Sequence, residues 1–131
     1  MTWGIEEALR PVLDDLQAAE GWIPPVDPTP WQDWQPSESC TLVAYGSSAG
    51  VWLDMSLDPA SGLARLADQV QDWVVEQLPG MHRPAVWPTC PAHPDSHPRQ
   101  AVVEGGRAVW ACPRGAAVST PIGRLGEAPP G

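Results

Sequence analysis

The sequence of 131 residues contains no phenylalanine and one tyrosine, whereas tryptophan occurs eight times. It also contains no lysine and no asparagine, so all seven basic residues are arginines. This bias towards Ala, Gly, Pro, Arg and Trp is typical of a GC-rich genome, and we infer no structure from it. A chain of this length forms one compact domain, or a small domain with an appended ribbon, and buries a core without requiring a metal.

The sequence also lacks the segments that direct a protein into or across a membrane. No apolar run approaches the roughly 18 residues of a membrane span, and no basic segment followed by an apolar run suggests a signal peptide. We therefore predict a cytoplasmic protein with no membrane partner, in which cysteines stay reduced. Three cysteines cannot all pair within one chain. Both points favour a metal over a disulfide for Cys90 and Cys112.

Common motifs of enzyme chemistry are missing as well. The chain has no HExxH helix, no glycine-rich phosphate loop after a strand and no nucleophile elbow. The segment GSSAG at 46–50 is a hairpin turn by context rather than a catalytic serine motif. The sequence therefore gives little support to an enzyme.

Negative charge is concentrated in the first part of the chain. Residues 1–79 carry thirteen acidic side chains against Arg10 and Arg65, a net charge of −11, whereas residues 80–131 carry three acids against five arginines, a net charge of +2. The acidic part would repel a phosphate backbone, so the charge disfavours nucleic acid as a partner and favours protein. The mildly basic part could contact an acidic partner or the acidic half of a second copy.

Apolar spacing predicts a first helix over residues 3–20, with Thr2 as its N-cap and Gly21 as its stop. Pro11 lacks a backbone donor, so the helix either kinks there or begins there. The apolar face consists of Ile5, Leu9, Val12, Leu13 and Leu16. The acidic side chains are expected to project elsewhere, namely Glu6, Glu7, Asp14 and Asp15.

Two strands and a second helix follow. The strands are predicted at Cys40–Tyr45 and Val51–Leu57, joined by the turn at 46–50. One face of the second strand carries Val51, Leu53, Met55 and Leu57. The second helix begins after an N-cap at Asp58 and ends before Pro79-Gly80, because its apolar residues keep helical spacing in between.

Residues 22–39 form a strap rich in proline and tryptophan, and we expect no regular element there because five prolines interrupt it. Its three indoles, Trp22, Trp31 and Trp34, are open to two interpretations. They pack onto the core, as tryptophan usually does, or they bind a protein partner.

The C-terminal part reads as a β-ribbon. Strands are predicted at 99–104 and 107–111 around a Gly105-Gly106 turn, and residues 118–122 are a candidate third strand. We divide the chain into an α+β domain at 1–80, a ribbon domain at 81–126 and a flexible tail at 127–131.

Four side chains in this part form the pattern C-x2-H-x3-H-x14-C, namely Cys90, His93, His97 and Cys112. Zinc takes four sulfur or nitrogen ligands in a tetrahedron, and Cys2His2 is a common closed set. The ribbon turn brings Cys112 back beside Cys90. A proline follows each of the four residues, which biases each one towards an extended conformation.

Alternatives to this zinc site remain open. In a site built from two CxxC pairs, the second pair would place its last ligand at position 115, which is Gly115 here. His97 must therefore complete the set of four, and His82 is a spare candidate. The ribbon could also lack a metal, or Cys90 and Cys112 could form a disulfide. If one ligand were absent, a metal-bound water could act as a hydrolytic nucleophile, with Asp95 or Glu104 as base. We interpret Cys40 as structural.

Four segments carry a resemblance to a known group of proteins: LARLADQVQDWVVEQL, WPTCPAHPDSHP, GRAVWACP and PIGRL. Over Leu63 to Leu125 the chain resembles small, uncharacterised zinc-ribbon-like proteins of high-GC Gram-positive bacteria. The resemblance implies a zinc-ribbon-like tail behind an amphipathic helix, and it implies no activity.

These observations predict an α+β fold of helix, antiparallel β-hairpin and helix, followed by a small zinc-ribbon-like β-hairpin. The function they favour is a non-enzymatic protein-interaction module with one structural zinc ion, binding through the ribbon and the strap. The alternatives are a small zinc-dependent hydrolase and an acidic mimic of nucleic acid.

Overall fold

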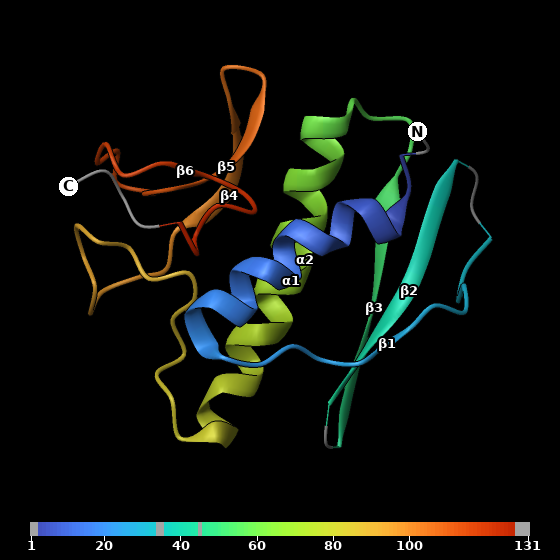
Figure 1. Cartoon of the computed structure of the whole chain (residues 1–131), viewed down its shortest axis with the longest axis horizontal. Helices are drawn as coiled ribbons and strands as arrows, with labels where there is room; N and C mark the ends of the chain where they lie inside the picture. Colours follow the sequence, from blue (N-terminus) through green and yellow to red (C-terminus); the bar gives the residue numbers. More distant parts are fainter. Residues whose placement is uncertain (1–2, 34–35, 45, 128–131) are drawn as a thin grey trace.

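The computed structural model describes residues 3–33, 36–44 and 46–127, in which two α-helices lie between two antiparallel sheets (Figure 1). The helices are α1 (Ile5–Glu20) and α2 (Pro59–Gln77), and α2 continues into the 3-10 helix η1 (Leu78–Met81). Each sheet has three strands in sequence order. Strands β1 to β6 span Val26–Asp27, Ser37–Ala44, Ser47–Asp54, Gln100–Glu104, Arg107–Ala111 and Thr120–Pro121. The predicted α+β class is confirmed.

Helix α1 begins at Ile5 and not at residue 3, with Gly4 as its N-cap, and Thr2 lies outside the described residues. Gly4 offers no capping side chain, so the Glu38 carboxylate of β2 accepts the Ile5 amide hydrogen at 2.8 Å. Pro11 lies inside the helix and does not begin it. Gly21 ends the helix with φ 76°, as predicted.

Both strands of the first hairpin begin earlier than predicted, and the turn between them is shorter. Strands β2 and β3 pair from Ser37↔Asp54 to Ala44↔Ser47, so residues 47–50 belong to β3 and the predicted turn at 46–50 is wrong. Gly46 adopts φ 71° beside the strand end, which allows a tighter connection. Tyr45 lies outside the described residues. Val51 and Leu53 are buried as expected, whereas Met55 and Leu57 follow the end of β3.

The strap also departs from the prediction, since it is not wholly irregular. Val26 and Asp27 form β1, which pairs with Leu42 and Thr41 of β2. The last predicted strap residues, 37–39, belong to β2. The strap therefore adds a third strand to the hairpin.

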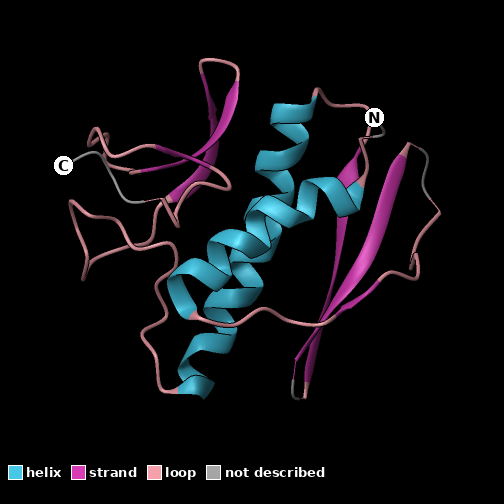
Figure 2. Ribbon diagram, viewed as in Figure 1, coloured by secondary structure: helices cyan, strands magenta, loops and turns pink. Residues whose placement is uncertain are grey.

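Helix α2 is the central element and contacts strands of both sheets, β3 on one side and β4 and β5 on the other (Figure 2). Asp58 caps it as predicted, because its side chain accepts the Ser61 amide hydrogen at 3.1 Å. The Gln69 side chain extends from α2 to β3. It accepts the Trp52 amide hydrogen at 3.0 Å and donates to the Trp52 carbonyl at 2.9 Å.

The second sheet follows the prediction closely. Strands β4 and β5 pair around Gly105 and Gly106, which both adopt positive φ. Strand β6 pairs with β5 within the segment expected to form a third strand. Apolar side chains from this sheet join those of α1 and α2 in one core, to which the C-terminal part contributes Trp87, Ala108, Trp110 and Ile122.

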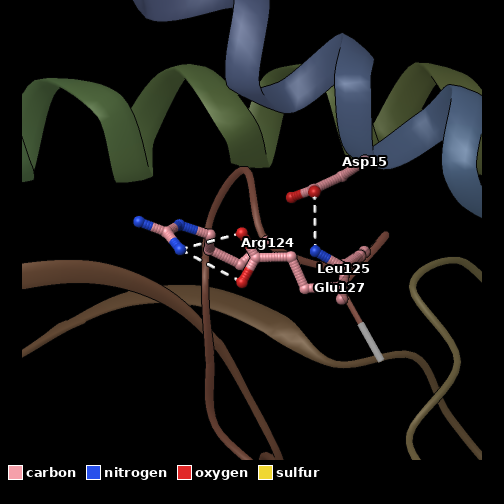
Figure 3. Close-up of polar contacts among 4 residues, drawn as sticks. All are labelled: Asp15, Arg124, Leu125 and Glu127. Carbon is pink, nitrogen blue, oxygen red and sulfur yellow. Dashed lines mark hydrogen bonds and ion pairs between the residues drawn. The ribbon is translucent and has the colours of Figure 1, made fainter. Parts of the chain in front are cut away.

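Asp15 is buried and fastens the C-terminal segment to α1, so the prediction that its side chain projects away from the apolar face is wrong. Its carboxylate accepts hydrogen bonds from Trp110 Nε1 at 2.8 Å, from the Gly123 amide at 2.6 Å and from the Leu125 amide at 2.9 Å. Figure 3 shows the carboxylate directed from α1 towards the Leu125 amide. Burial raises the pKa of Asp15, while the three donors oppose the rise.

We expect Asp15→Asn to lower the free energy of unfolding by about 2 kcal/mol, because the amide nitrogen replaces an acceptor and faces a donor. Because the pKa of Asp15 is raised in the folded state, its contribution to stability is fully present below the unfolded pKa. That contribution is lost as the pH rises through the folded pKa. The difference between wild type and variant should therefore narrow as the pH rises, as measured by urea unfolding at several pH values. A constant difference would contradict the assignment.

Candidate metal centre

The four predicted ligands converge, although they come from two separate segments. Cys90, His93 and His97 lie in the loop between η1 and β4, and Cys112 follows the last residue of β5. One ligand atom from each lies within 4.8 Å of the other three. Among the described residues, no other group of at least three His, Cys, Asp or Glu side chains could hold a metal ion in this way.

Two interatomic distances fit the edges of a tetrahedron around zinc. His93 Nδ1 lies 3.7 Å from Cys90 Sγ and 3.5 Å from Cys112 Sγ. Bonds of 2.0–2.3 Å at tetrahedral angles place nitrogen and sulfur ligands about 3.5 Å apart. His93 therefore offers Nδ1 as the ligand atom, between the two sulfurs.

His97 presents its other ring nitrogen to the site. Its Nδ1 lies 3.0 Å from the Pro98 carbonyl oxygen, which only accepts, so Nδ1 carries the proton in this contact. In the neutral ring, Nε2 then holds the free lone pair. That Nε2 is buried and has no hydrogen-bond partner among the described residues. A buried acceptor of this kind fits a metal ligand, and ligating histidines commonly donate their second N–H to a carbonyl.

Backbone amides of the residues after Cys112 lie close to its sulfur. The Arg114 amide donates to Sγ at 3.3 Å. Burial alone would raise the pKa of the Cys112 thiol, but the amides of Ala116, Arg114 and Gly115 and the Cys90 side chain lower it overall. The thiolate is the form that binds a metal, so this environment suits ligation.

The two cysteines sit in matching turns. The His93 amide donates to the Cys90 carbonyl at 3.0 Å, and the Gly115 amide donates to the Cys112 carbonyl at 3.1 Å. Gly115 thus occupies the position in the second turn that His93 occupies in the first. Its φ of 84° favours glycine, and His97 supplies the remaining ligand from the loop.

Gln71 of α2 holds both ends of the ligand loop. Arg99 donates its amide hydrogen to the Pro88 carbonyl at 2.8 Å, which closes the loop. The buried Gln71 side-chain amide then donates to the Trp87 carbonyl at 3.0 Å and also to the Arg99 carbonyl. Trp87 itself packs edge-on against Trp110, with ring centroids 5.2 Å apart. The loop is therefore anchored to the core by polar and apolar contacts.

Sequence reasoning missed Gln71, and a signal for it was present. Gln71 falls on the apolar face of α2, four residues after Ala67 and three before Val74, and all three are buried. A polar residue on such a face must bond to a buried partner. That rule would have predicted its role, though not its partners.

Cys40, which was predicted to be structural, and His82, the spare ligand candidate, lie apart from this group. Cys40 is buried in β2, and burial together with the charges of Asp27 and Glu6 raises the pKa of its thiol to about 11. It therefore stays protonated at neutral pH, which agrees with a structural role. His82 caps η1 with φ 60° and does not belong to the ligand group.

The strap indoles that were predicted to contact a partner have contacts within the chain. Trp22 packs edge-on against Trp73, with ring centroids 6.4 Å apart. The Trp31 ring lies against Gly50, and its Nε1 donates to the Cys40 carbonyl at 2.9 Å. Trp31 is still 42% exposed. Trp34 lies outside the described residues. Partner binding by the strap stays a prediction.

No protein-family model, curated protein or solved structure matches the chain. That the chain is related to zinc-ribbon-like proteins stays a prediction. Neither helix in the described part of the chain is long and apolar enough to cross a membrane.

We expect Gln71→Ala to lower the free energy of unfolding by about 2 kcal/mol, because two buried carbonyls lose their donor. We expect it also to weaken the binding of added zinc, because the loop that carries three of the candidate ligands loses its anchor. Gln69→Ala is the matched control, because it also removes two main-chain contacts of an α2 glutamine, but on β3. Competition with a chromogenic chelator measures the affinity and urea unfolding the stability. Equal zinc affinity in both variants would contradict the anchoring role.

Proposed function

We propose that Cys90, His93, His97 and Cys112 hold one zinc ion in a closed structural site, and that the chain is a non-enzymatic module that binds a protein partner. The observation that carries the zinc site is the convergence of four ligand atoms within 4.8 Å, together with the buried and unpaired His97 Nε2. The donor set, Cys2His2, is one of the common sets in structural zinc sites.

The site supports a structural rather than a hydrolytic role. Four protein ligands fill a tetrahedron, and a hydrolytic zinc needs one position for water. The two acids considered as bases, Asp95 and Glu104, are exposed. Asp95 lines a depression of about 220 Å³ with Glu20 and Thr89, and none of the four ligands lines it. The donor geometry therefore favours the structural alternative over the hydrolase.

The zinc ion would fasten a zinc-ribbon-like element. It would link the loop before β4 to the end of β5, and the β4–β5 hairpin lies between them. Both cysteines are buried, so an ion bound to them would make the end of the hairpin more rigid. Rigid surfaces of this kind suit binding, because little conformational entropy is lost when a partner docks.

Two features favour a protein partner. The net charge of −11 on residues 1–79 opposes binding to nucleic acid. Trp31 remains 42% exposed on the first sheet, with its ring 6.1 Å from that of Trp52. Exposed, well-supported indoles commonly provide much of the binding energy at protein interfaces.

We expect purified wild-type protein to contain one zinc ion per chain by elemental analysis, and to lose thermal stability when a chelator removes it. Cys90→Ser and His97→Ala should each lose the ion, because three ligands bind zinc more weakly than four. Cys40→Ser should keep it, since Cys40 lies outside the ligand group. A wild-type protein that holds no zinc and is unaffected by the chelator would remove the proposed site.

We expect Trp31→Ala to reduce capture of the partner about tenfold, because loss of a central indole costs about 1.4 kcal/mol or more. Val103→Ala tests the ribbon as the alternative surface, since Val103 is also 42% exposed but lies on β4. Partners from a cell extract would be identified by mass spectrometry and titrated against both variants. If only Val103→Ala weakens binding, the strap is not the interface.

A further inference from the structure

A groove of about 670 Å³ runs beside the second sheet, on the part of the chain with net positive charge. Three arginines line it, Arg99 before β4, Arg107 at the start of β5 and Arg124 in the C-terminal loop. Its polar and apolar walls include Thr120, Pro91 and Leu125.

Arg99 is the unusual member of this group, because it is only 6% exposed. Its Nη1 donates to the Val118 carbonyl at 2.7 Å and to Thr120 Oγ1 at 2.8 Å, which fixes the guanidinium in place. Its buried Nε has no hydrogen-bond partner among the described residues, and no described carboxylate lies within ion-pair distance, although the Asp15 carboxylate acts on the cation from further away. Burying a cation without a carboxylate in direct contact is costly. An anion in the groove would offset that cost.

The other two arginines differ in their pairing. Arg107 is exposed and forms no ion pair with a described residue. Arg124 donates to both carboxylate oxygens of Glu127, at 2.8 and 3.0 Å (Figure 3). Among the described residues that line the groove, Glu127 is the only acid, so positive charge remains in excess there.

The apolar part of the groove narrows the choice of ligand. Val118 and Leu125 line it beside the arginines and are only partly buried. A bare phosphate or a nucleic acid backbone would leave these side chains without a partner. A peptide that combines carboxylates with apolar side chains fits both kinds of surface.

We infer that this groove binds an acidic segment of the protein partner, with carboxylates against Arg99 and Arg107 and an apolar side chain against Leu125. This inference rests on the proposed binding function and names the chemistry of the partner. Glu127 competes with the carboxylates of the partner for Arg124, because its own carboxylate already accepts hydrogen bonds from that side chain. Pro91 follows the ligand Cys90 and lines the groove, so the zinc loop supports one wall.

The test uses the chain of residues 1–131, with its zinc content measured beforehand, and a fluorescein-labelled peptide of alternating glutamate and leucine. A peptide with glutamine in place of each glutamate is measured beside it. We expect fluorescence anisotropy to show binding of the glutamate peptide that weakens at high salt. Arg107→Gln should weaken binding about fivefold, and Glu127→Gln should strengthen it about twofold. Arg10→Gln is the control, because it removes the same charge from an exposed position on α1.

Any of four results would overturn the inference. The first two are equal binding of the two peptides, and an equal loss of peptide affinity in Arg10→Gln and Arg107→Gln. The others are displacement of the peptide by stoichiometric inorganic phosphate, and a dimer in light scattering that dissociates on Arg107→Gln. The last would make a second copy the occupant. The zinc content separates this inference from the proposed function. Zinc without peptide binding rejects the groove alone, and peptide binding without zinc rejects the metal site alone.

Discussion

The buried carboxylate of Asp15 is the contact on which the C-terminal part of the structure depends. It joins α1 to Trp110 on β5 and to the backbone of Gly123 and Leu125, which are about a hundred residues away in sequence. Its charge loses hydration on burial, and three donors offset part of that loss. The same contact positions the candidate metal site and the arginine-lined groove, because Trp110 lies two residues before Cys112 and Leu125 lines the groove.

A second polar anchor holds the opposite side of the ligand loop. Gln71 binds the carbonyls of Trp87 and Arg99, which flank the loop, and Asp15 binds the indole of Trp110, against which Trp87 packs. The four candidate ligands therefore lie on a base built from both helices. Convergence of the four donor atoms follows from this base, and an ion would tighten an arrangement that the core already favours.

The sequence predicted the parts of this structure that depend on local rules. Asp58 caps α2, Gly105 and Gly106 form a hairpin turn, and the metal pattern brings its four residues together. It did not predict features set by distant partners. The burial of Asp15 depends on amides near the C-terminus, and the shift of the first hairpin depends on pairing of residues 47–50 with β2. Neither partner is visible from the spacing of one segment.

The position of Gln69 has a consequence for how this chain meets other chains. Its amide covers the main-chain N–H and C=O of Trp52 on β3, the outer strand of the first sheet. The opposite outer strand, β1, has two residues, and prolines precede and follow it. Open strand edges recruit foreign strands and seed aggregates. Both edges of this sheet are therefore protected from pairing with a strand of another chain, so this sheet associates with other chains through side-chain contacts.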